Sequence, residues 1–270
     1  AGLWTAMGDA FTGPELEGLR PPEPKEEEGA PRRGRRPYLP LLPGALAAPF
    51  ASPSSIFMLA VSSPLMVGAH IAVVAAGFLG LLLAAPLYGY LCGFLFDVAL
   101  RAAEDPKQHP RVKGLLWSEE SRLSFVGYFF RWLGASFAAL LPLLLILPSY
   151  ETAPSFLWGA AVAVAAILGV AWYPMTLLQA AHGTGLSPFN YPQGFRIARK
   201  LGADYGACAG FFLVTTGAVA GLQVAVSSWA ATFDGGPMAA RFLMGWVAYA
   251  SILMQMRAVG LLCWARDDAR

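Results

Sequence analysis

Long apolar segments, separated by short charged or proline-containing stretches, run through most of this chain. Five of them stand out, at residues 54–96, 123–147, 156–181, 205–231 and 242–264. The last four each have the length of one helix across about 30 Å of hydrocarbon, at about 1.5 Å per residue. Tryptophan and tyrosine residues lie near the ends of the last three, as amphipathic rings do at a membrane surface. The pattern predicts an all-α fold, a polytopic helical bundle in a membrane.

The first apolar segment, 54–96, is too long for one crossing and barely long enough for two. No polar turn interrupts it, and Pro64 and Pro86 are its most evident break points. A single crossing would place ten of the Lys and Arg residues that flank the apolar segments on one side of the membrane and five on the other. If the segment crosses twice, or enters and returns, fourteen lie on one side and only Arg241 lies opposite. Positively charged loops remain in the cytoplasm. We therefore expect about six membrane-inserted helices, or five spans plus a re-entrant or broken first element, with both termini cytoplasmic.

Composition agrees with this class and divides the chain into regions. Hydrophobic residues make up 56% of the sequence and charged residues 13%, whereas about a quarter of the residues in soluble domains are charged. Residues 1–37 are rich in Pro, Glu, Gly and Arg, which predicts a flexible cytoplasmic tail. Residues 38–53 read as a proline-rich interfacial approach, 54–266 as the transmembrane bundle and 267–270 as a C-terminal tail. The net charge of +2 gives no overall field that would attract nucleic acid.

Small residues mark one face of the segment 205–231. Its glycines form two GxxxG units that fall within about 60° of each other around a helix: Gly206, Gly210, Gly217 and Gly221. Such a face lets another helix backbone approach closely. Gly89 and Gly93 repeat the motif in the first segment and are a candidate partner. Packing within the chain is the favoured interpretation, and an interface with a second copy or another subunit is the alternative.

Ionisable residues inside apolar segments are candidates for a functional site. Asp97, Arg131, Arg257 and His70 form this set. One interpretation pairs Asp97 with one of the two arginines while the other reaches lipid headgroups; the alternative is a substrate or ion site. His70 has no second histidine or carboxylate nearby in the sequence, which disfavours a proton relay or a metal site there. The three cysteines are far apart in apolar segments, which is typical of small buried residues.

The loop at 186–204 interleaves aromatic and basic residues between two apolar segments. Phe195, Arg196, Arg199 and Lys200 fit a lipid-interface helix on an anionic membrane surface better than an RNA-binding loop. The sequence contains no phosphate-binding glycine loop, nucleophile elbow or metal-binding signature. We therefore expect no catalytic residues, no cofactor and no metal.

Three stretches carry a resemblance to a known family. They are GYLCGFLFDVALRAAEDPKQHP at 89–110, YPMTLLQAAHGTGLSPFNYPQGFRIARK at 173–200 and MRAVGLLCWAR at 256–266. Together they resemble a family of uncharacterised polytopic membrane proteins of bacteria and archaea, and the likeness covers most of residues 50–266. The resemblance implies a multi-pass architecture and, because the family has no assigned activity, no site residues. The N-terminal tail lies outside it.

These patterns favour a non-enzymatic integral membrane protein of the bacterial cytoplasmic membrane. We expect a structural or accessory subunit that packs through small-residue helix faces. Its expected partners are membrane lipids and other membrane subunits or a second copy, without nucleic acid. The alternative is a small-molecule or lipid transporter or permease-like component with a site near Asp97, Arg131 and Arg257, in which the broken first segment lines a cavity. A membrane enzyme acting on lipids ranks third, because no nucleophile, metal set or acid–base pair is recognisable.

Overall fold

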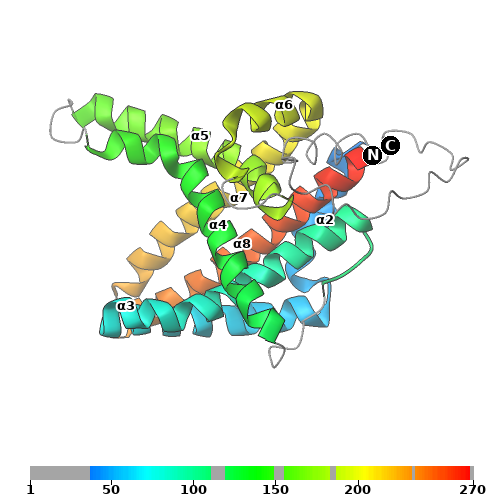
Figure 1. Ribbon diagram of the computed structural model, residues 1–270. Helices are drawn as coiled ribbons and strands as arrows, with labels where there is room; N and C mark the ends of the chain where they lie inside the picture. The colour runs from blue at the N-terminus through cyan, green and yellow to red at the C-terminus, as the bar shows by residue number, and fades with distance from the viewer. Residues whose placement is uncertain (1–36, 111–118, 149–154, 183–186, 233–234, 268–270) are drawn as a thin grey trace, which may run out of the picture.

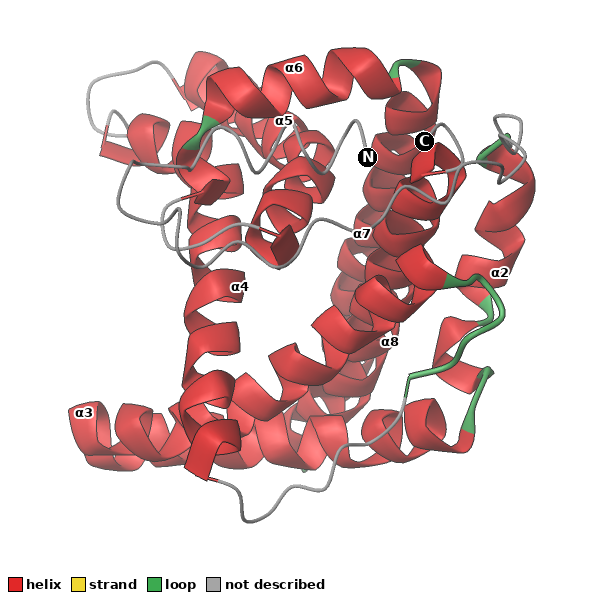
Figure 2. Cartoon of the chain, turned by 45° about the vertical axis from the view of Figure 1, so that its right-hand side comes forward, coloured by secondary structure: helices red, strands yellow, loops and turns green. Residues whose placement is uncertain are grey.

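The fold is all-α throughout the described residues, which are 37–110, 119–148, 155–182, 187–232 and 235–267 of a computed structural model. Figure 2 shows helices and loops, and no strand, in the described part of the chain. In chain order the helices are η2 (Leu39–Leu41), α2 (Leu42–Leu46), η3 (Ala48–Phe50), α3 (Pro53–Glu104), α4 (Glu119–Ile146), α5 (Ser155–His182), η5 (Ser187–Phe189), α6 (Tyr191–Leu201), α7 (Ala203–Ala230) and α8 (Gly236–Asp267) (Figure 1). The predicted fold class is confirmed.

Five stretches of helix in the described residues are long and apolar enough to cross a membrane. They are Pro53–Gly80, Val126–Ile146, Ser155–Ala181, Ala203–Ala230 and Gly236–Ala265. These stretches overlap the five apolar segments of the sequence, because a lipid-facing helix must be apolar over its whole span. The protein therefore has the features of a multi-pass membrane protein. The tail at 1–36 lies outside the described residues, so the flexibility expected there stays a prediction.

Helix α3 is a helical hairpin. Its backbone reverses at Gly77, where φ is 54° and ψ is −123°, a conformation that only glycine adopts readily. Beyond the reversal, Gly80 lies against the backbone of Ala72, and the Tyr88 hydroxyl donates a hydrogen bond to the Met66 carbonyl over 3.4 Å. The 54–96 segment therefore goes out and returns, so the broken first element predicted from the charge pattern is present.

The position of the break differs from the sequence-based prediction. Pro64 and Pro86 lie inside the two helical arms, and neither interrupts its arm. Membrane helices tolerate proline because neighbouring groups can satisfy the freed carbonyl. A reversal needs a residue that can take a positive φ angle, which proline cannot. The residues on either side of the reversal, Val74, Phe78 and Leu79, are apolar and exposed, so no polar turn marks it in the sequence.

Helix α8 is the centre of the bundle and the most buried of the five candidate spans. It packs against both arms of α3 and against α7 (Figure 1). Two α8 glycines allow this close packing: a Cβ on Gly245 would lie 2.5 Å from Ser63 Oγ, and one on Gly260 would overlap the Ala99 carbonyl. Gln255 ties α8 to α7 because its Nε2 donates to the hydroxyls of Thr215 and Thr216.

The proline-rich segment before α3 folds onto α8 as three short helices. Tyr38 is fully buried, and its hydroxyl donates a 3.1 Å hydrogen bond to the Ala258 carbonyl. Burial raises the pKa of Tyr38, so the hydroxyl remains a protonated donor. Leu39, Leu46 and Phe50 on the outer side are exposed, which agrees with a position at a membrane interface.

Candidate helix-packing and membrane-contact sites

The glycine face of α7, defined by Gly206, Gly210, Gly217 and Gly221, points away from the other described residues. A Cβ placed on any of the four would meet no atom within 4 Å. The buried residues of α7, including Cys208 and Phe212, lie about 150° away around the helix. Among the described residues, no helix approaches this face closely.

This arrangement corrects one expectation from the sequence. Gly89 is buried and Gly93 half-buried in the returning arm of α3, which packs against α4 and α8. A pairing of these glycines with the α7 face would bring backbone atoms close to the four α7 glycines, and none is there. The described residues therefore do not pair Gly89 and Gly93 with the α7 face, and both a contact within the chain and an interface with another helix stay predictions for that face.

The glycines that do mediate close contacts were missed by sequence reasoning. Besides Gly245 and Gly260, a Cβ on Gly169 of α5 would lie 2.7 Å from the Ala139 carbonyl of α4. Of these three glycines, only Gly169 belongs to a sequence motif for close helix packing, because Ala165 precedes it by four residues and completes a small-xxx-small pair. Neither α8 glycine has such a neighbour at that spacing.

Asp97 forms an ion pair within its own helix. Its Oδ2 accepts a hydrogen bond from Arg101 Nε over 2.7 Å, one turn further along α3. The expected pairing of Asp97 with Arg131 or Arg257 is therefore replaced by an i, i+4 pair, a spacing that brings side chains together on one helix face. Both groups are partly exposed, so the pair contributes little to stability.

Arg257 holds the loop that follows α3. Its side chain is 6% exposed, Nη1 donates to the Gln108 carbonyl over 2.6 Å, and Nη2 donates to the Pro106 carbonyl. Asp105 supplies the nearby negative charge. Because both acceptors are backbone carbonyls, the charge is used to fix the loop in place rather than to contact a ligand.

Removing this anchor should loosen the loop. The Gln108 amide, which donates to the Asp105 carbonyl, reports on this loop. In Arg257→Gln, we expect its hydrogen exchange to accelerate about tenfold or more. The reason is the loss of two charged hydrogen bonds worth about 1.5–3 kcal/mol each. Exchange measured by mass spectrometry in detergent would check this. Arg131→Gln serves as the control and should leave the loop unchanged; equal exchange in wild type and Arg257→Gln would contradict the anchoring role.

The structure gives the other two ionisable candidates separate surroundings. Arg131 of α4 lies over the ring of Tyr128, with 6.0 Å between the guanidinium carbon and the ring centroid. His70 is exposed on the first arm of α3, and Asp97 is on the returning arm, beside Arg101. The described contacts therefore do not assemble His70, Asp97, Arg131 and Arg257 into one site.

Helix α6 has the features expected of a helix at a membrane surface. Asn190 caps its N-terminus by accepting a hydrogen bond from Gln193 N, and Gly194, Ile197 and Leu201 form its buried side. Phe195 is 64% exposed. The three basic residues are also exposed: Arg196, Arg199 and Lys200. Positive charge beside an exposed aromatic ring suits contact with anionic lipid headgroups.

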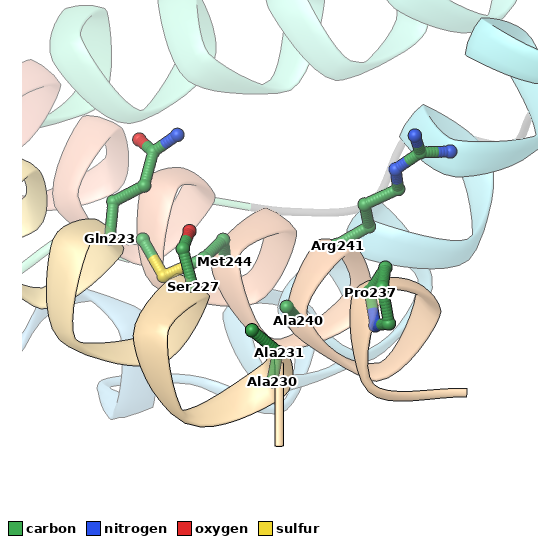
Figure 3. A pocket seen from close by; sticks show the side chains of 8 residues that line it. All are labelled: Gln223, Ser227, Ala230, Ala231, Pro237, Ala240, Arg241 and Met244. Atoms are coloured by element: carbon green, nitrogen blue, oxygen red, sulfur yellow. The ribbon is translucent and has the colours of Figure 1, made fainter. Parts of the chain in front are cut away.

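A cleft of about 280 Å³ lies where α7 ends and α8 begins. Figure 3 shows Gln223 and Arg241 at opposite edges, with Ser227 and Met244 between them. Its floor is apolar and formed mainly by alanines. The lining contains neither a carboxylate nor a histidine, so these residues offer hydrogen bonds and one positive charge but no acid–base pair.

No protein-family model, curated protein or solved structure matches this chain. The family resemblance drawn from three sequence stretches therefore stays a prediction.

Proposed function

We propose that this protein is a non-enzymatic accessory subunit of a membrane assembly, and that the α7 glycine face binds a transmembrane helix of its partner. One observation carries the proposal: four glycines, spread over about 22 Å of helix, leave room for a Cβ at every position. Lipid chains gain little from contact with bare backbone. A second helix can come close enough to gain dispersion energy and Cα–H···O contacts.

The same proposal places both termini in the cytoplasm of a bacterial cell. The α3 hairpin supports this orientation because it returns the chain to the end from which it entered. Fourteen basic residues then flank the membrane on one side: Arg32, Arg33, Arg35, Arg36, Arg101, Lys107, Arg111, Lys113, Arg122, Arg196, Arg199, Lys200, Arg266 and Arg270. Arg241 remains on the other, which satisfies the positive-inside rule.

Photo-crosslinking in native membranes tests the partner helix. Val214 lies beside the glycine face and is 71% exposed. We expect benzoylphenylalanine at position 214 to form a protein adduct, and Gly217→Leu to reduce that adduct at least tenfold by blocking close approach. Mass spectrometry of the adduct would distinguish a second copy from a different subunit.

The control uses an exposed position on a different helix. Val164 of α5 is 56% exposed, and Gly159 of α5, like Gly217, has open space around its Cβ position. Benzoylphenylalanine at 164 should give mainly lipid adducts, and Gly159→Leu should leave the adduct at 214 unchanged. Lipid adducts alone at position 214 would contradict the proposal.

A further inference from the structure

An apolar cleft of about 350 Å³ lies where α4, α5, α6 and α7 meet. This volume falls within the range of small-ligand pockets, roughly 300–1,000 Å³. Ala139 and Pro142 of α4 and Leu168 of α5 line it, together with the aromatic rings of Trp172, Tyr191, Phe195 and Tyr205. From this meeting point α7 diverges from the α4–α5 pair (Figure 1), so the cleft opens between membrane-spanning helices.

The aromatic side of the cleft is held rigidly. The Tyr191 hydroxyl donates to the Ala138 carbonyl over 2.6 Å, and the Tyr205 hydroxyl donates to the Ala171 carbonyl over 2.9 Å. The Trp172 ring stacks on Tyr191, contacts Tyr205 edge-on, and has its centroid 4.6 Å from that of Phe195. Burial raises the pKa of Tyr191, which keeps its hydroxyl a donor. The cleft is therefore formed before any ligand binds.

A polar group beside the cleft lacks a partner. Trp172 Nε1 is buried and finds no acceptor within the described part of the chain. The adjacent Cζ2 edge of the same indole lies beneath Gly194 of α6, where a Cβ would come within 2.8 Å. Buried N–H groups usually have an acceptor, so this donor is unusual.

Basic residues on α6 stand next to the same cleft. Tyr191 and Phe195 line the cleft, and Arg199 continues their row one turn further along the helix. Arg196 and Lys200 lie on the neighbouring, exposed row. Within the described residues, the side chains of these three cations form no ion pair or hydrogen bond. Positive charge thus borders an apolar, preformed cleft.

We propose that this cleft binds one anionic phospholipid, with an acyl chain along Ala139, Pro142 and Leu168 and the phosphate on Arg199. Arg196 and Lys200 add positive charge around the headgroup. The combination of an apolar cleft and an adjacent row of cations matches the order of groups in a phospholipid: acyl chain, then phosphate.

Native mass spectrometry of the full chain in detergent tests this site with phosphatidylglycerol and phosphatidylcholine of equal chain length. We expect one phosphatidylglycerol to be retained about tenfold more than phosphatidylcholine. Arg199→Gln should lower phosphatidylglycerol retention about fivefold and phosphatidylcholine retention less, because both lipids carry the phosphate but the choline cation already weakens its attraction to Arg199. Leu168→Trp, at an exposed position that needs no repacking, should fill the cleft and lower the retention of both lipids about tenfold. Arg241→Gln, in the other cleft, should change neither.

Three results would overturn the proposal. Equal retention of the two lipids by the wild type would remove the headgroup assignment. Unchanged retention in Leu168→Trp, with the variant folded as judged by its melting temperature, would exclude an acyl chain from the cleft. Displacement of the lipid by free glycerol phosphate would show that the cations bind phosphate without the chain.

Discussion

Replacing Gly260 by leucine should strongly destabilise the fold, whereas the same replacement at Gly217 should leave the monomer stable. A Cβ on Gly260 would overlap the Ala99 carbonyl and lie 2.7 Å from Ala102 Cβ. Backbone atoms cannot rotate away, so α8 would have to separate from the returning arm of α3. Overpacking of a core costs about 1–3 kcal/mol when side chains can adjust, and we expect a loss at or above the upper end of that range here.

Thermal unfolding in detergent, followed by circular dichroism and size-exclusion chromatography, measures both variants under one condition. Gly217→Leu adds the same side chain to a membrane helix but meets no atom within 4 Å of the new Cβ. It should melt within a few degrees of the wild type while losing the crosslink to a partner helix. A Gly217→Leu variant that melts as early as Gly260→Leu would show that the α7 glycine face is buried within the monomer.

Span positions could be predicted from the sequence because a helix in lipid must be apolar for about 20 residues. The return of the first segment was also predictable, since only that path gathers the basic flanks on one side. The lipid-facing and core-facing sides could not be distinguished. In water, polar residues mark the outer face of a helix, but here both faces of α7 are apolar. A GxxxG pattern therefore shows where close packing is possible without showing which side is occupied.

The contacts of the candidate site residues were harder to predict, because several of them are made to backbone atoms far away in the sequence. The Asp97–Arg101 pair is local and follows from helical spacing. Arg257, in contrast, binds carbonyls about 150 positions away in the sequence, and backbone acceptors leave no residue signature. Gly260 carries no local motif either, because its partner is the backbone of Ala99 on another helix. Long-range contacts to backbone are invisible in a single sequence.

A substitution at Gly77 should open the α3 hairpin. In Gly77→Val, a β-branched residue would have to take φ near 54° and ψ near −123°, at a cost of about 1–3 kcal/mol or more. Straightening α3 relieves that strain, but a continuous helix of 52 residues, about 78 Å long, exceeds any bilayer. The variant must therefore either keep the strained turn or separate its two arms, and both lower stability.

Crosslinking between the arms can distinguish the closed hairpin from the open one. Met66 and Tyr88 face each other across the hairpin, so cysteines at these positions, with the three native cysteines changed to alanine, should be joined by a short bis-maleimide. Gly77→Val should reduce that crosslink several-fold and lower the melting temperature. Gly68→Ala is the matched control: Gly68 lies within the first arm in open space, and alanine favours helix by about 1 kcal/mol. Gly68→Ala should therefore stabilise the first arm, whereas Gly77→Val should strain the reversal. Full crosslinking in both variants would mean that the reversal does not depend on glycine at position 77.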